Sequence, residues 1–136
     1  ATNVVPETCE ITIDIRVPDM AAAEEAMAIV EGITPEDADC RIVIEGGIDR
    51  PPYDKFDGIT ELFDHAKALA GEIGFELEDL KTGGGSDGNF TAALGIPTLD
   101  GLGADGHGAH SNKEFIFYSS LVERCRLMIG LFETLR

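Results

Sequence analysis

The residues with the clearest chemical potential lie in one short stretch, residues 106–114. His110 stands there at the end of a glycine-rich run, directly before Ser111. Ser111 and Glu114 have the S-x-x-E spacing of a capping box, which predicts a helix start and a fixed local backbone. A fixed backbone points the neighbouring imidazole in one direction, as a metal ligand requires. One histidine is nevertheless short of the roughly three protein ligands that a catalytic zinc needs.

A second stretch, residues 83–88, is called here the glycine-rich loop. Three glycines lead into Ser86 and Asp87, and a helix is expected directly behind them. Such a loop can bring backbone N–H groups close to an anion, while the helix adds the positive end of its dipole. The loop lacks the lysine and the spacing of a nucleotide-binding P-loop. On pattern alone, a tight turn between a strand and a helix is the more frequent explanation.

Two other polar residues are candidates with open alternatives. Arg16 lies on the polar face of an alternating segment, where it could capture a substrate carboxylate or simply pair with Asp14 or with a neighbouring strand. His107 competes with His110 for a ligand role, and either histidine taken singly is more often a surface residue.

These residues need a scaffold, and the hydrophobic pattern predicts strands alternating with helices. Strands are predicted over 11–17, 41–45, 75–78 and 96–99. Helices are predicted over 20–31, 56–73 and 87–94, and from a capping box at Ser120 and Glu123 to Arg136. The inward face predicted for the last helix consists of Leu121, Cys125, Met128, Phe132 and Leu135.

The proline pair after Arg50 is the best candidate for a domain boundary, because it forbids both helix and central strand. Residues 51–136 alternate as an α/β domain does. Residues 1–50 form a strand-helix-strand piece, and two strands seldom hold together alone. The fold class predicted is therefore α/β, with a first part that needs a partner sheet.

Composition excludes some classes of partner. The formal net charge of −16 repels phosphate backbones and anionic lipid, so neither nucleic acid nor membrane is expected as a partner. No apolar run approaches the roughly 20 residues of a membrane span. Cys9, Cys40 and Cys125 are odd in number and far apart, which predicts reduced, mostly buried thiols and favours the cytoplasm without establishing it. The absence of an initiator Met before Ala1 suggests a fragment, with Met removal as the ordinary alternative.

Taken in order, these motifs resemble those of the co-catalytic zinc exopeptidase family. That family includes glutamate carboxypeptidases, aminoacylases, acetylornithine deacetylase and succinyl-diaminopimelate desuccinylase. Residues 2–6 and 13–16 resemble its inserted lid, or dimerisation, domain, whereas residues 83–87 and 110–114 resemble the closing part of its catalytic domain. The resemblance implies that 1–50 is the C-terminal part of the lid domain and 51–136 the C-terminal part of the catalytic domain.

The resemblance also implies roles for single residues. His110 would be the last zinc ligand, while Asn3 and Arg16 would grip the free carboxylate of the substrate. In the family, two zinc ions share a bridging water that a glutamate general base activates for attack on an amide carbonyl. The loop residues that would line the substrate pocket are Gly84, Gly85 and Ser86.

The remaining ligands and the general base of the family would lie before Ala1. No catalytic residue is therefore assigned in this chain, which is expected to be inactive alone. The implied substrate is a small peptide or N-acyl amino acid, cleaved by a protein completed by a missing N-terminal part and dimerising through its lid. The alternative is a non-catalytic binding or dimerisation module built from the same fold pieces.

Overall fold

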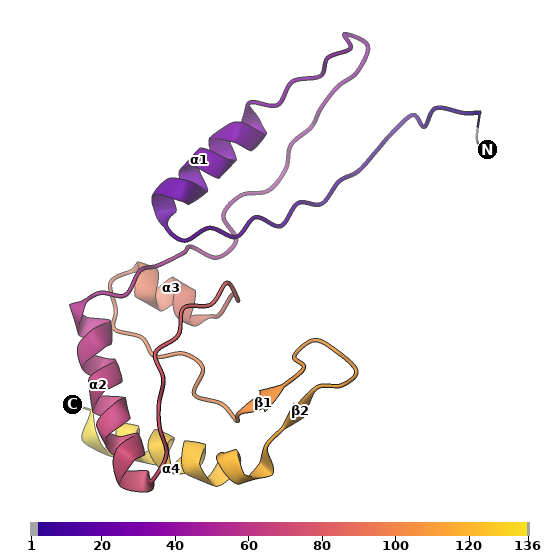
Figure 1. The fold of residues 1–136 in the computed structure, drawn as a ribbon. Helices are drawn as coiled ribbons and strands as arrows, with labels where there is room; N and C mark the ends of the chain where they lie inside the picture. The colour runs from indigo at the N-terminus through magenta and orange to yellow at the C-terminus, as the bar shows by residue number, and fades with distance from the viewer. Residues whose placement is uncertain (1–2, 136) are drawn as a thin grey trace.

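The computed structural model describes residues 3–135, in which helices are joined by long irregular segments (Figure 1). Thr2 of the N-terminal motif and Arg136, the predicted end of the last helix, lie outside the described residues. None of the helices in this part of the chain is long and apolar enough to cross a membrane. The elements in chain order are α1 Met20–Glu31, α2 Asp57–Ile73, α3 Gly88–Ala93, β1 Gly106–His107, β2 Phe115–Ile116 and α4 Tyr118–Thr134.

The first helix, α1, has the bounds that its sequence predicts. Asp19 is its N-cap, and Oδ1 of this residue accepts a hydrogen bond from the Ala22 N–H at 2.9 Å. That bond satisfies one of the four amides that a helix start leaves without partners. Gly32 ends the helix, and its own N–H donates to the Ala28 carbonyl. Ala23 is buried, whereas most of α1 stays open to solvent.

The predicted ends of α2 and α3 are confirmed to within a residue or two. The pattern predicts a helix over 56–73, and α2 begins at Asp57. Gly74 ends it at φ 108°, in the left-handed region where a side chain would be strained. The helix predicted over 87–94 is the shorter α3, followed by Gly95 at φ 79°.

The core is formed by α2 and α4, which pack against each other. Ala66 and Ala70 of α2 meet Leu127 and Leu131 of α4, and all four are at most 5% exposed. The small alanines let the leucine side chains of the other helix approach closely, so the pair excludes water efficiently. Around this centre lie half-buried apolar residues: Leu69, Ile73, Phe75, Leu77, Leu99 and Leu102.

The predicted start of α4 is wrong. The helix begins at Tyr118, and its N-cap Phe117 makes no side-chain capping bond. Ser120 is instead 8% exposed within the first turn. Its hydroxyl donates to the Phe117 carbonyl at 2.7 Å and accepts from the Asp105 N–H at 3.0 Å. The hydroxyl thus anchors the preceding loop, a contact that the local spacing with Glu123 could not reveal.

The predicted inward face of α4 is also wrong. The buried residues are Ser120, Leu127 and Leu131, whereas Phe132 is 77% exposed. Apolar residues occur on every side of this helix, so periodicity alone does not decide which side is inward. The inward side is set by α2, because its small alanines leave room for Leu127 and Leu131 to pack against it. The residues that were predicted to face inward and are at least partly open to solvent are Leu121, Cys125, Met128, Phe132 and Leu135.

The prediction of mostly buried thiols is wrong as well, because all three cysteines, Cys9, Cys40 and Cys125, are exposed.

The α/β sheet expected from the sequence does not form in the described residues, and the structure is mostly helical. A helix satisfies its backbone hydrogen bonds internally, whereas a strand needs a neighbour in register. Residues 3–135 provide no such neighbour, and Ile11 and Val43 are 76% and 63% exposed. The segments predicted as strands and found without strand pairing are 11–17, 41–45, 75–78 and 96–99.

A small hairpin that the sequence pattern did not predict lies directly before α4. Strands β1 and β2 pair antiparallel, with Gly106 opposite Ile116. The two backbones approach so closely that a Cβ on Gly106 would collide with the Phe115 carbonyl. Gly108, at φ 76°, would place a Cβ 2.8 Å from the carbonyl oxygen of Lys113. Both positions therefore accept only glycine.

The proline pair after Arg50 has no helical or strand structure. Figure 1 shows α1 with its flanking segments on one side of this connector and α2 with α4 on the other. Ion pairs between Lys55 and Asp79, and between Lys81 and Asp54, tie the chain after the prolines to the approach to the glycine-rich loop. The division of the chain at residue 50 into lid and catalytic portions stays a prediction.

Candidate functional site

The glycine-rich loop, which joins Thr82 to Asn89, directs several amides toward its own side chains. Thr82 Oγ1 accepts from the Gly84 N–H at 3.2 Å, and Ser86 Oγ accepts from the Gly88 N–H at 3.0 Å. The Ser86 N–H donates to Asn89 Oδ1 at 3.0 Å. These three amides are engaged within the loop. Its shape is therefore fixed by internal hydrogen bonds, and the short α3 behind it adds little dipole.

Arg16 contacts the start of this loop from far away in the sequence. Its Nη1 donates to the Gly83 carbonyl at 3.1 Å, while Nη2 and Nε donate to Asp14 Oδ2 at 3.0 and 3.3 Å. The structure thus brings Arg16 next to the loop that carries Gly84. It also contains the Arg16–Asp14 pair, the alternative role considered for this arginine. The Arg16 side chain is 65% exposed, so a ligand in solvent can reach it.

A second arginine, Arg50, contacts the other end of the loop. Its Nη1 donates to Asp87 Oδ1 at 2.8 Å. Close by, Asn89 Nδ2 donates to the Pro51 carbonyl at 3.0 Å. Arg50 was not among the candidates taken from the sequence, where its one signal is a charge directly before a stiff proline pair.

His110 lies in the turn between β1 and β2. The helix start predicted from Ser111 and Glu114 is wrong, because the chain folds back into β2. The two residues still fix the backbone: Ser111 Oγ donates to the Gly108 carbonyl at 2.7 Å, and Glu114 Oε2 accepts from the His110 N–H at 3.2 Å. His110 adopts φ 63°, a left-handed conformation that few residues other than glycine occupy. An exposed imidazole is therefore carried by a constrained backbone.

His107, the competing histidine, packs in a small aromatic cluster. Its ring lies edge-on to the rings of Phe115 and Phe117, with centroid distances of 5.8 and 5.5 Å. The two phenylalanine rings meet in the same manner at 5.4 Å. Edge-to-face contacts of this kind orient all three rings. His107 therefore contributes to the hairpin's packing, a structural role that His110 does not share.

The described residues do not complete a metal site. Within residues 3–135, no group of three or more His, Cys, Asp or Glu side chains is placed to hold an ion. His110 can supply one of the roughly three protein ligands that a catalytic zinc requires. Asn3 is exposed, and no hydrogen bond in the described part of the chain joins it to Arg16 or to the loop. The donors among residues 3–135 therefore do not fit a complete zinc centre.

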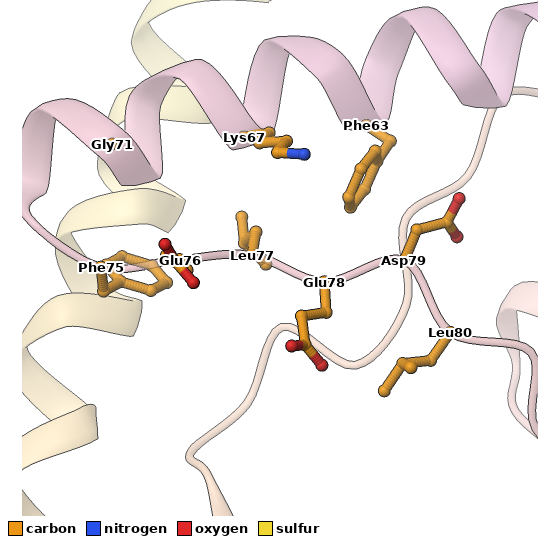
Figure 2. A pocket seen from close by; sticks show the side chains of 9 residues that line it. All are labelled: Phe63, Lys67, Gly71, Phe75, Glu76, Leu77, Glu78, Asp79 and Leu80. Carbon is orange, nitrogen blue, oxygen red and sulfur yellow. The ribbon is translucent and has the colours of Figure 1, made fainter.

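One hollow, of about 570 Å³, lies beside α2 (Figure 2). Figure 2 shows Phe63 and Lys67 on the helix facing the extended segment that follows Gly74. The hollow contains none of the residues predicted to bind substrate or metal, so it lies apart from the candidate site. Its lining consists of Phe63, Lys67, Gly71, Phe75, Glu76, Leu77, Glu78, Asp79 and Leu80.

The chain is similar to two longer proteins. It is 30% identical over 129 residues to carboxypeptidase G2 of Pseudomonas sp. (strain RS-16), covering 90% of this chain and 31% of that protein. It is also 30% identical over 133 residues to the uncharacterized protein YqjE of Bacillus subtilis (strain 168), covering 98% of this chain and 32% of that protein. The chain thus spans about a third of the length of these relatives. No solved structure matches it significantly.

A family comparison covers nearly the whole chain. The sequence model of peptidase family M20/M25/M40 matches residues 15–134. The matched range includes Arg16, the glycine-rich loop and His110, and it continues to the end of α4. The match agrees with the resemblance to the zinc exopeptidases that the motifs carry. The chain therefore belongs to peptidase family M20/M25/M40.

Proposed function

We propose that this chain is the C-terminal portion of a zinc-dependent metallohydrolase that cleaves an amide bond in a small peptide or N-acyl amino acid with a free carboxylate. The observation that carries the proposal is the hydrogen bond of 3.1 Å between Arg16 Nη1 and the Gly83 carbonyl. It places an arginine suited to carboxylates against a loop whose glycines leave the backbone accessible. Membership of the family, and similarity to a protein named carboxypeptidase G2, support the same substrate class.

Arg16 is the proposed carboxylate-binding residue. A guanidinium can donate two parallel hydrogen bonds to one carboxylate. In this structure Nη2 and Nε of Arg16 both donate to a single oxygen of Asp14, Oδ2. A substrate carboxylate would compete with Asp14 for the same N–H donors of the Arg16 guanidinium. In a chain with a net charge of −16, an anionic substrate depends on such local positive charge. Asn3 would share the carboxylate, and Gly84, Gly85 and Ser86 would line the pocket.

Zinc, when bound in the complete protein, would polarise the amide carbonyl and lower the pKa of a bound water. His110 would provide one ligand from its constrained turn. The other ligands and the general base would come from residues outside this chain, so the 136 residues alone are a substrate-binding part without the reacting groups.

Exposed apolar surface on α4 supports the proposal that this chain is part of a longer polypeptide. An open groove of about 420 Å³ is lined by residues of α4 and of the segment 102–104, and it includes neither Leu127 nor Leu131, which pack on α2. We expect the preceding part of the same protein to pair with the extended segments and to cover this groove, and the lid portion to form a homodimer. In this arrangement, residues 1–50 belong to the lid and residues 51–136 to the catalytic domain. The groove is lined by Leu102, Gly103, Ala104, Leu121, Arg124, Cys125, Met128, Ile129 and Phe132.

The test is hydrolysis of peptides ending in glutamate and of N-acyl amino acids, with zinc added. The protein extended upstream is expected to turn over, whereas the 136-residue chain should be slower by several orders of magnitude because it lacks the general base. Turnover by the chain alone at an ordinary enzymatic rate would contradict the proposal.

The specific variant is Arg16→Ala in the extended protein. Loss of a bidentate carboxylate contact should cost about 2–4 kcal/mol in kcat/KM, mainly through KM. Arg41→Ala is the matched control, because Arg41 is also exposed and begins the segment 41–45, which was likewise predicted as a strand. Equal kinetics for both variants would exclude the proposed role of Arg16. Absence of any turnover by the extended protein would favour the non-catalytic binding module.

A further inference from the structure

Arg50 occupies the junction between the connector and the glycine-rich loop. It is the last residue before the proline pair, and its Nη1 reaches Asp87 Oδ1 at 2.8 Å. Its guanidinium carbon lies 5.6 Å from the centre of the Phe90 ring, a cation–π arrangement. One side chain thus contacts both the end of the loop and the first turns of α3.

The same side chain also packs on the loop backbone. A Cβ built on Gly85 would lie 3.0 Å from Arg50 Cδ and 3.5 Å from its Nε. Gly85 is not among the glycines with positive φ, so a side chain at this position would press against Arg50 and would not strain the backbone. Beside it, Asn89 donates to the Pro51 carbonyl at 3.0 Å, which adds a second link between connector and loop.

The ion pair alone would be a weak anchor. The side chain of Asp87 is 93% exposed and that of Arg50 is 39% exposed, so solvent screens their attraction. The link gains its strength from three contacts made by one side chain: the ion pair, the Phe90 ring and the packing on Gly85. The proline pair stiffens the connector, so little conformational freedom remains to be lost when Arg50 docks.

We propose that Arg50 is a positioning residue, which clamps the glycine-rich loop to the connector and thereby sets the loop's position for substrate. This inference rests on the proposed function for its kinetic consequence, but the clamp itself is a property of the 136-residue chain. Arg16 meets the start of the loop at Gly83, whereas Arg50 holds its end at Gly85 and Asp87. The two arginines therefore act on the same loop in different ways.

The first arm of the test is amide hydrogen exchange in the 136-residue chain, read by NMR. Arg50→Ala should speed exchange of the Ser86 and Gly88 amides about fivefold while amides of α2 stay unchanged, since only local contacts are lost. Arg41→Ala is the control and should change neither set. Unchanged loop amides, or equal acceleration in α2, would overturn the clamp.

A double-variant comparison sharpens this arm. Gly85→Ala should loosen the loop in the native background, because the new methyl group pushes against Arg50 Cδ. Combined with Arg50→Ala, the same substitution should add less than about twofold, since the steric conflict has gone. Additive effects of the two changes would show that Arg50 and the loop do not act as one unit.

The second arm uses the protein extended upstream. Arg50→Ala should raise KM about fivefold and change kcat less than twofold, because a displaced loop weakens substrate binding before it affects the reacting groups. A rise in KM without faster loop exchange would mean direct contact with substrate and would overturn the positioning role. Faster loop exchange in an extended protein that hydrolyses no amide would keep the clamp and remove the proposed function.

Discussion

The helix pair α2–α4 and the segments that flank α1 differ in how their backbone hydrogen bonds are satisfied. Residues of α2 and α4 make their backbone hydrogen bonds within each helix, and Ala70 and Leu127 are fully buried between them. Residues 11–17 and 41–45 have the alternation of strands, but no strand of the described chain pairs with them. A helix forms its hydrogen bonds within one segment, whereas a strand needs a second segment in register, and none pairs with these two segments in the described residues.

The largest effect expected from this difference is in amide hydrogen exchange. Amides in the middle of α2 and α4 should exchange about a thousandfold more slowly than those of residues 11–17, which pair with no strand in the part of the chain that the structure describes. Exchange measured by NMR on the 136-residue chain tests this directly. Strong protection in residues 11–17 would show that the chain supplies a strand partner, for example from a second copy.

A smaller effect should follow from removing the centre of the helix pair. Leu127→Ala leaves a void against Ala66 and Ala70 and should lower the free energy of unfolding by about 2–5 kcal/mol. Ile129→Ala is the control, because Ile129 is 56% exposed and should cost less than about 1 kcal/mol. Urea unfolding followed by circular dichroism at 222 nm, a general helix signal, compares the two variants. Equal losses would mean that α4 packs through a different face.

The hairpin offers a similar comparison between two histidines: His107 packs against aromatic rings, whereas His110 is exposed. In the extended protein, His110→Ala should weaken zinc binding by at least about a hundredfold, because it removes a proposed ligand. His107→Ala should change zinc affinity little and instead loosen the cluster with Phe115 and Phe117. Zinc titration with a competing chelator measures both. A larger loss of affinity in the His107 variant would reverse the assignment.

The smallest effect concerns α1, a helix with little tertiary support. Asp19→Ala removes the N-cap bond to the Ala22 N–H and should destabilise α1 by about 1 kcal/mol. Since α1 buries little besides Ala23, this loss should appear as fraying of α1 alone. Chemical shifts of residues 20–24 report it, with Glu24→Ala as a surface control. A matching loss in α2 would show that the two parts fold as one unit.

Structural features that depend on residues close together in the sequence were predictable. The Asp19 cap and the Gly74 stop define helix ends through contacts of a few residues, and both are confirmed. The inward face of α4 was not predictable, because Leu127 is selected by Ala66 and Ala70 on another helix. The predicted strands were wrong for the same reason, because strand pairing depends on segments that are distant in sequence.

In the candidate site, too, local motifs were recognisable in the sequence and contacts between distant residues were not. The chemistry suggested for Arg16 and His110 came from motifs and from a family resemblance. The structure places Arg16 against Gly83 of the glycine-rich loop, and the roles of both residues stay predictions. Arg50 gave no comparable signal, because its partners Asp87 and Phe90 become neighbours only after the connector folds back. The turn around His110 formed a hairpin in place of a helix, although the same two side chains fix its backbone.

The close approach of the two hairpin strands has a consequence for mutational libraries. Gly106 and Gly108 are required by the backbone that surrounds them, whatever the protein binds. A library that randomises residues 106–110 and is screened for folding alone should return glycine at these two positions and tolerate variety at Ala109. In the protein extended upstream, position 110 should narrow to histidine only when the screen demands activity, so two successive screens would separate architecture from chemistry within five residues.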